Sequence, residues 1–226
     1  MEEESEGEEE TRGAGALGKK LALAGIAVVI VVLAAVIGLL AYKGHKKKLD
    51  ETAIVAAVTD STLILREVLG AEGAADAVSR LDAHLARVKA AERTPLADAA
   101  EDYVLGAREI ARRRAEATRL APPAAAARQA LAAHLAAGGR RNDGWFRAAG
   151  DLKKRVENAH YELNAALKTL DSLLDGMLES RKRLGPLVGE KLVVGADVVS
   201  AARGRVQEEL QRSATELERA RQIPLG

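Results

Sequence analysis

The pattern of apolar and charged positions sets one long uncharged run near the N-terminus apart from the rest of the chain. No charged residue stands between Lys20 and Lys43. At about 1.5 Å per residue, residues 21–42 make a helix of roughly 33 Å, which matches a hydrocarbon core of about 30 Å. Apolar residues occupy every face of this helix, whereas a helix in a water-soluble core carries a polar stripe. We therefore predict a transmembrane helix over residues 21–42.

A cleaved signal peptide and a buried soluble helix are the alternative interpretations of this run. A signal peptide has a shorter apolar region of about 7 to 15 residues, followed by a small-x-small cleavage site. The triplet Val36-Ile37-Gly38 fits such a site only loosely, and Leu39-Leu40-Ala41 places leucine where a small residue is needed. The length and the missing site favour an uncleaved anchor.

Basic residues flank the run on both sides and predict its contacts with the lipid bilayer. The short segment 43–48 is the basic juxtamembrane part, in which each lysine near an anionic surface contributes about 1 kcal/mol. Residues 1–20 hold seven glutamates and several glycines without apolar periodicity, so we predict a disordered acidic tail. The residues expected at the membrane interface are Lys19, Lys20, Tyr42, Lys43, Lys46, Lys47 and Lys48.

The orientation of the span follows from a small difference in flanking charge. The lysines after the span slightly outnumber the basic residues before it, which favours a cytoplasmic C-terminal domain. The opposite expectation is that a short tail and one span often export a large C-terminal domain, and long domains cross regardless of charge. The layout resembles membrane-tethered bacterial helical proteins, from chemoreceptor-type sensor bundles to division or envelope scaffolds. We therefore predict a single-pass protein of the bacterial inner membrane with its C-terminal domain in the cytoplasm.

Beyond the lysines, glycine and proline punctuate a chain that lacks strand signals. We predict an all-α fold, in which a single transmembrane helix precedes a helical bundle with an antiparallel coiled-coil hairpin. Thr94-Pro95 fits an N-cap followed by a first-turn proline, and Asn142 offers the same cap chemistry before Trp145. The predicted helical segments are Leu49–Leu69, Ala74–Arg93, Leu96–Ala121, Ala124–Ala137, Trp145–Leu184 and Leu187–Gln222.

Residues 49–138 form the first predicted bundle, and an internal similarity suggests how it is built. Ala71–Ala86 and Ala121–Ala136 are identical at nine of sixteen positions, six of which are alanine. The similarity indicates either a duplicated helical hairpin or the alanine-rich composition alone. A duplication would make hairpins of Leu49–Arg93 and Leu96–Ala137, which could pack as a four-helix bundle.

Residues 145–222 show the clearest periodicity after the span. Apolar residues alternate at spacings of three and four over several heptads, which predicts a helix-packing seam. Gly185-Pro186 is expected to reverse the chain, so that the return helix continues the seam as an antiparallel hairpin. The seam consists of Trp145, Leu152, Val156, Leu163, Leu170, Leu173 and Met177, continued by Leu192, Val199, Val206 and Leu217.

The composition and the motifs of the chain argue against a catalytic, cofactor or metal site. The absence of cysteine excludes disulfides, thiol catalysis and cysteine-based metal sites. The four histidines are scattered without metal-ligand spacing, and no phosphate-binding or nucleophile motif appears. A net charge of +1 gives no reason to expect a nucleic-acid partner, and the arginines of Arg108–Leu120 stand at ion-pair spacing from glutamates. We predict no catalytic residue, no cofactor and no metal, and therefore not an enzyme.

Two function classes follow from this architecture. The first is a membrane-anchored, non-enzymatic scaffold or tether that engages a protein partner or self-associates as a homo-oligomer through its coiled-coil helices. The second is a membrane-bound sensor or regulator whose bundle binds a small ligand, which requires a pocket that alanine-rich, aromatic-poor helices rarely provide. A buried polar pocket would favour the sensor, whereas an exposed apolar strip along Trp145–Leu217 would favour the scaffold.

Overall fold

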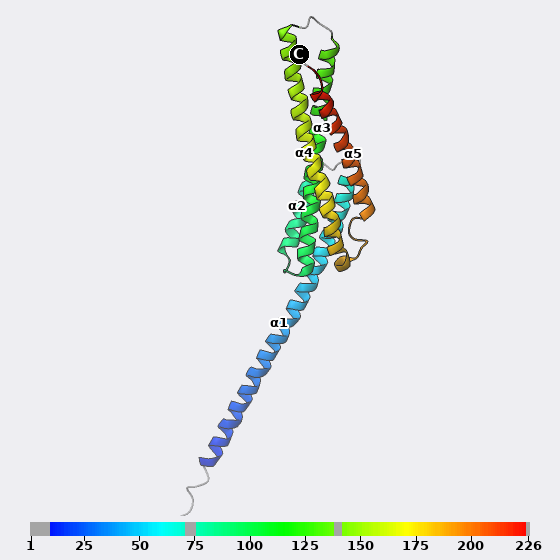
Figure 1. Ribbon diagram of the computed structural model, residues 1–226. Coiled ribbons are helices and arrows are strands. Elements are labelled where there is room, and N and C mark those ends of the chain that lie inside the picture. The colour runs from blue at the N-terminus through cyan, green and yellow to red at the C-terminus, as the bar shows by residue number, and fades with distance from the viewer. Residues whose placement is uncertain (1–9, 71–75, 138–141, 225–226) are drawn as a thin grey trace, which may run out of the picture. The chain divides into compact units, whose positions relative to one another are not determined.

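The computed structural model describes residues 10–70, 76–137 and 142–224, with residues 10–32 and Ala34 described in their backbone only, and the regular elements of these residues are all helices. This confirms the predicted all-α class and the helical bundle. Figure 1 shows the helices α1 (Glu10–Leu69), α2 (Ala77–Ala90), α3 (Pro95–Ala136), α4 (Asp143–Val188) and α5 (Ala196–Arg221).

The chain divides into two compact units, Met1–Leu49 and Asp50–Gly226. In the first unit α1 begins at Glu10, inside the stretch predicted to be a disordered tail, and alanine, leucine and lysine in its first turns are good helix formers. Residues 1–9 of that tail lie outside the described residues. Most of the predicted span at 21–42 also has no described side chains. Among the residues that are described, no helix is both long and apolar enough to cross a membrane.

The structure describes the side chains of only some of the residues predicted at the membrane interface. The side chains of Lys19 and Lys20 are not described. Those of Tyr42, Lys43, Lys46, Lys47 and Lys48 are exposed along α1, as are Leu33, Val36, Ile37, Leu39 and Leu40.

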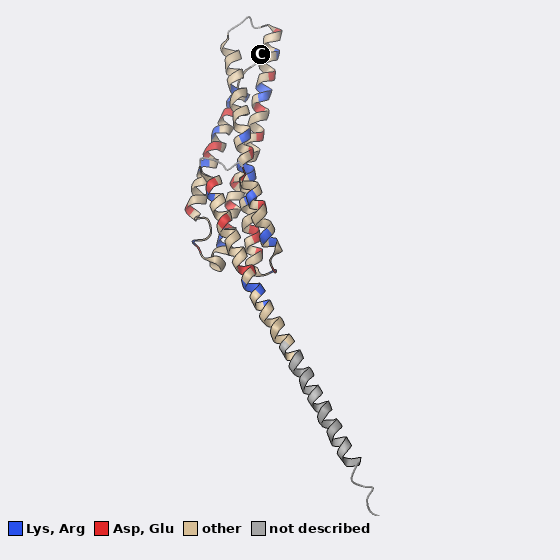
Figure 2. Cartoon of the chain, turned by 180° about the vertical axis from the view of Figure 1, so that it is seen from behind, with Lys and Arg blue, Asp and Glu red and all other residues tan. Residues whose placement is uncertain are grey.

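In the second unit α4 packs against both α3 and α5, and α2 packs against α3. One continuous core draws on all five helices, including Ile64, Leu81, Tyr103, Leu174 and Val199. The predicted boundary between a bundle at 49–138 and a hairpin at 145–222 does not separate two cores, because α3 and α5 both pack against α4. Acidic and basic residues alternate over the helix surfaces of this unit, as Figure 2 shows.

Side chains cap the helices where the sequence predicted caps. The Thr94 hydroxyl accepts a hydrogen bond from the Ala97 backbone N–H at 3.1 Å, and Pro95 occupies the first helical position. The Asn142 side chain accepts one from the Trp145 N–H at 2.9 Å. Each cap satisfies one of the N–H groups that a helix start leaves without an intrahelical partner.

The predicted helix break at Pro122-Pro123 is absent, because α3 continues through both prolines to Ala136. Two prolines remove the hydrogen bonds to the carbonyls of Thr118 and Arg119. All four of these residues are exposed, so water can satisfy the carbonyls, while buried Ala117 and Ala124 keep the helix packed on either side. Residues 96–137 therefore do not form the second hairpin of the proposed duplication.

The predicted reversal at Gly185-Pro186 is also displaced. Pro186 lies in the last turn of α4, which ends at Val188, and Gly189 takes the positive φ of 108° that turns the chain. The Gly189 N–H donates to the Gly185 carbonyl at 2.8 Å. Glycine adopts positive φ without a steric penalty, whereas proline fixes φ near −65°, so Gly189 rather than Pro186 ends the helix.

Residues 189–195 form a connection instead of the first turns of the predicted return helix. The Val194 N–H donates to the Tyr103 hydroxyl at 3.0 Å, that hydroxyl lies 2.8 Å from the Thr62 hydroxyl, and Thr62 donates to the Leu192 carbonyl at 2.8 Å. Arg181 donates to the Val194 carbonyl at 3.0 Å. The connection thus satisfies its backbone groups with side chains of α1, α3 and α4.

Candidate functional site

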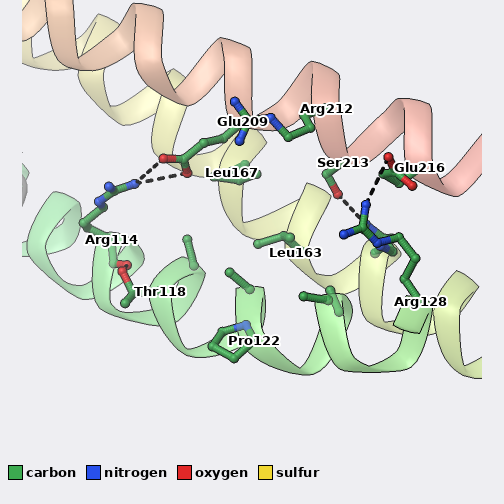
Figure 3. A pocket seen from close by; sticks show the side chains of 15 residues that line it. Arg114, Thr118, Pro122, Arg128, Leu163, Leu167, Glu209, Arg212, Ser213 and Glu216 are labelled. Carbon is green, nitrogen blue, oxygen red and sulfur yellow. Dashed lines mark hydrogen bonds and ion pairs between the residues drawn. The ribbon is translucent and has the colours of Figure 1, made fainter. Parts of the chain in front are cut away.

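A recess of the second unit is lined by residues of α3 and α5, with α4 between them. Its volume is about 540 Å³, within the range of small-molecule sites. Figure 3 shows α3 residues on one wall, α5 residues on the other, and Leu163 and Leu167 of α4 between them. We call this recess the α3–α5 groove. Its lining residues are Arg114, Ala117, Thr118, Ala121, Pro122, Ala124, Ala125, Arg128, His160, Leu163, Leu167, Glu209, Arg212, Ser213 and Glu216.

Short side chains explain why the groove stays open. Both α3 and α5 pack against α4, but α3 and α5 are not themselves a closely packed pair. The α3 wall consists largely of alanines with Pro122, and these side chains are too short to reach α5. Interiors normally fill such space at high packing density. The alanine-rich composition that argued against a pocket therefore produces one here.

Two ion pairs span the groove from α3 to α5. The Arg114 guanidinium lies 3.2 Å from the nearer carboxylate oxygen of Glu209. The Arg128 guanidinium lies 3.2 Å from Glu216, whose carboxylate also accepts from Arg219 at 2.9 Å. Figure 3 shows the two pairs on either side of Leu163 and Leu167. Each glutamate is thus already matched by at least one arginine.

Arg212 is the remaining charge of the groove. Its side chain is exposed on α5, between Glu209 and Ser213 in sequence, and no ion pair or hydrogen bond joins it to another residue in the described part of the chain. Three arginines and two glutamates line the groove, which leaves one formal positive charge. The groove therefore favours an anion over a cation.

A buried polar pair lies on the floor between α4 and α5. His160 Nδ1 lies 2.8 Å from the Ser213 hydroxyl oxygen, and both residues are only 5% exposed. Burial lowers the pKa of the His160 imidazole below its ordinary value; the Glu216 carboxylate opposes this shift and the Arg128 guanidinium adds to it. The other ring nitrogen, Nε2, is buried without a hydrogen-bond partner among the described residues, a costly arrangement that is uncommon in native proteins.

Within the described residues, the backbone around Ser213 offers no free donors for an oxyanion. Ser213 lies in the interior of α5, where the neighbouring backbone N–H groups belong to the helix. Such groups are not free to stabilise an oxyanion.

The predicted seam residues lie along α4, α5 and their connection, but the buried face is wider than a two-stranded seam. Val156, Leu163, Leu170, Met177, Val199, Val206 and Leu217 are buried, whereas Trp145, Leu152, Leu173 and Leu192 are half-buried. Leu192 lies in the connection and not on a return helix.

Sequence reasoning missed His160, Leu167 and Leu174, which are buried at heptad spacing beside the predicted positions. A helix with neighbours on several sides buries a third heptad position, and this repeat of seven was the signal that could have found them. None of the groove residues on α3 had been singled out as a site, because alanines carry no functional signature.

The histidines do not come together. His134 stacks on Trp145 with ring centroids 5.0 Å apart, while His84 lies on α2, where burial lowers the pKa of its imidazole and the Asp60 carboxylate opposes that shift. Within the described ranges, no group of histidine and acidic residues is arranged to hold a metal ion. The arginines of α3 form ion pairs, but not at the spacings the sequence suggested: Arg113 pairs with Glu116 at 2.6 Å rather than with Glu109, which pairs with Arg108 at 2.6 Å.

Comparison with known proteins returned no matching family model, no matching curated protein and no matching solved structure. The function is therefore argued from the groove and from the pattern of the chain.

Proposed function

We propose that this protein is a membrane-anchored, non-enzymatic regulator whose helical bundle binds a small ligand in the α3–α5 groove. The observation that carries the proposal is a recess of about 540 Å³ that combines apolar lining residues with three arginines and two glutamates. Ligand sites in proteins have this composition, in which apolar walls supply binding energy and a few polar groups supply orientation.

The membrane anchor is the second part of the proposal. Its support is the uncharged run at 21–42, the exposed apolar residues from Leu33 to Leu40, and the exposed lysines that follow Tyr42. Solvent exposure of so many large apolar side chains on one helix is unfavourable in water and favourable in lipid. We propose the bacterial inner membrane, with the bundle on the cytoplasmic side.

The scaffold hypothesis has less support from the surface of the second unit. A scaffold that binds through its coiled-coil seam needs that seam exposed, whereas most of the seam residues on α4 and α5 pack inside this bundle. In the described part of Asp50–Gly226, the exposed large apolar residues are Leu63, Leu105, Tyr161 and Leu187, which come from three different helices. Binding to a protein partner and self-association stay predictions.

A ligand screen with a blocked groove tests the proposal. Full-length protein in lipid nanodiscs is screened against a library of small metabolites by thermal shift, alongside the variants Ala125→Phe and Ala126→Phe. Ala125 lines the groove, whereas its neighbour Ala126 is exposed and does not line it. We expect compounds that stabilise the wild type and Ala126→Phe but not Ala125→Phe. A screen in which every stabilising compound acts equally on both variants would contradict the proposal.

A further inference from the structure

We infer that the ligand of the α3–α5 groove is an anionic amphiphile, a small molecule with one carboxylate and an apolar hydrocarbon body. This inference rests on the proposed function and names the class of ligand. It follows from the distribution of charge, the nature of the walls and the continuation of the groove along the bundle.

The charge of the groove selects an anion. Glu209 is engaged by Arg114 through both carboxylate oxygens, at 3.2 and 3.3 Å. Glu216 is shared between Arg128 and Arg219. A cationic ligand would have to displace one of these arginines, whereas an anion can pair with Arg212 without breaking an existing ion pair. Arginine binds carboxylates through two parallel N–H···O hydrogen bonds, which fixes their orientation.

The walls select an apolar body. Between the two ion pairs, α3 presents Ala117, Ala121, Pro122 and Ala125, and α4 presents Leu163 and Leu167 on the floor. Only Thr118 adds a polar side chain to this wall of α3, and its hydroxyl already donates to the Arg114 carbonyl at 2.9 Å. A ligand with many hydroxyl groups would leave most of them without partners here, at a cost of several-fold in affinity for each such group.

The groove continues beyond the Arg128–Glu216 ion pair. A second recess of about 250 Å³ shares Arg128 and Glu216 with the first and is lined further by Leu131, Leu135, Val156 and Ile223. The two recesses are thus arranged in a row along α3 and α5, on either side of one ion pair. An elongated hydrocarbon body fits this arrangement better than a compact one.

Equilibrium dialysis with matched probes tests the inference. Full-length protein in nanodiscs is dialysed against octanoate, against octan-1-ol as its uncharged counterpart, and against octylammonium as its cationic counterpart, with empty nanodiscs as the reference. We expect octanoate to bind most tightly. Arg212→Gln is expected to weaken octanoate binding roughly five- to tenfold, as for a partly screened charge-assisted contact, and to leave octan-1-ol unchanged. Arg155→Gln, an exposed residue of α4 outside the groove, is the matched control.

The outcomes separate the inference from the proposed function. Equal affinity for octanoate and octan-1-ol, with no effect of Arg212→Gln, overturns the preference for an anion and leaves the groove as a ligand site. Octanoate binding that survives Ala125→Phe shows that the probe lies elsewhere and overturns the inference as well. Absence of binding by all three probes overturns the amphiphile class, and the library screen with Ala125→Phe and Ala126→Phe then decides the proposed function by itself.

Discussion

Leu173 and Leu174 of α4 allow a test that distinguishes the helix packing seen in the structure from the packing that the heptad pattern predicts. The pattern places Leu173 in the seam, whereas the structure leaves Leu173 half-buried and buries Leu174 completely, at 0% exposure. Both residues are leucine, both lie in the middle of α4, and replacement by alanine changes helix propensity equally. Their difference in stability therefore reports burial alone.

The expected magnitudes follow from this burial. Leu174→Ala removes methylene groups from a closed core and leaves a cavity, which costs about 2 to 5 kcal/mol. Leu173→Ala removes a side chain that is already partly in water. Full burial of a leucine side chain contributes about 1.5 to 3 kcal/mol, so we expect this variant to lose roughly half of that free energy and to leave little cavity. We expect Leu174→Ala to be the more destabilising by at least about 1 kcal/mol.

Urea denaturation of residues 50–226, followed by circular dichroism, measures the two free energies of unfolding. These residues have a core made from their own helices. Equal m-values for the two variants would show that both unfold from a similarly compact state. Equal costs, or a larger cost for Leu173→Ala, would refute the reasoning and support the two-stranded seam.

Further predictions concern the connection, a cap, a titration and the membrane span. Tyr103→Phe removes the hydroxyl that accepts from the Val194 N–H and is expected to cost about 1 to 3 kcal/mol in urea denaturation; a cost near zero would show that the connection does not depend on it. Thr94→Ala removes the cap of α3 and is expected to cost about 0.5 to 2 kcal/mol, against almost none for Thr94→Ser. Because burial lowers the pKa of His160, the unfolded chain binds more protons as pH falls below about 6.5, so stability declines there. His160→Gln is expected to make the melting temperature less sensitive to pH in that range, and an unchanged slope would assign the decline to other groups. Val31→Arg, with a central charge that costs about 2.5 to 3.5 kcal/mol on the insertion scale, is expected to reduce the carbonate-resistant membrane fraction, and wild-type protein that salt alone releases would contradict the anchor.

The sequence predicts those elements of the fold that depend on local chemistry. Thr94 and Asn142 are short-range caps, and their helices begin where these residues indicate. The periodicity of α4 likewise identifies a packed helix, because a heptad repeat requires a partner along one face. Burial of Val156, Leu163, Leu170 and Met177 agrees with that face.

Elements that depend on tertiary context were predicted incorrectly or not at all. Proline at 122 and 123 normally ends a helix, but α3 continues through both, with Ala117 and Ala124 buried in the core on either side. The end of α4 depends on which of several glycines adopts positive φ, and hydrogen bonds to Tyr103 and Arg181 help to decide this from outside the segment. The α3–α5 groove arises from a space between helices that no short stretch of sequence specifies.

Photolabelling tests the central claim, that the α3–α5 groove of a membrane-anchored bundle takes up a small amphiphilic anion. Full-length protein in nanodiscs is irradiated with a diazirine analogue of octanoate, and the labelled peptides are mapped by mass spectrometry. The account predicts labels on residues 117–125 of α3 and 163–167 of α4, which octanoate suppresses by competition and Ala125→Phe abolishes. Labels confined to α1, or spread over the bundle and unchanged in Ala125→Phe, would contradict it.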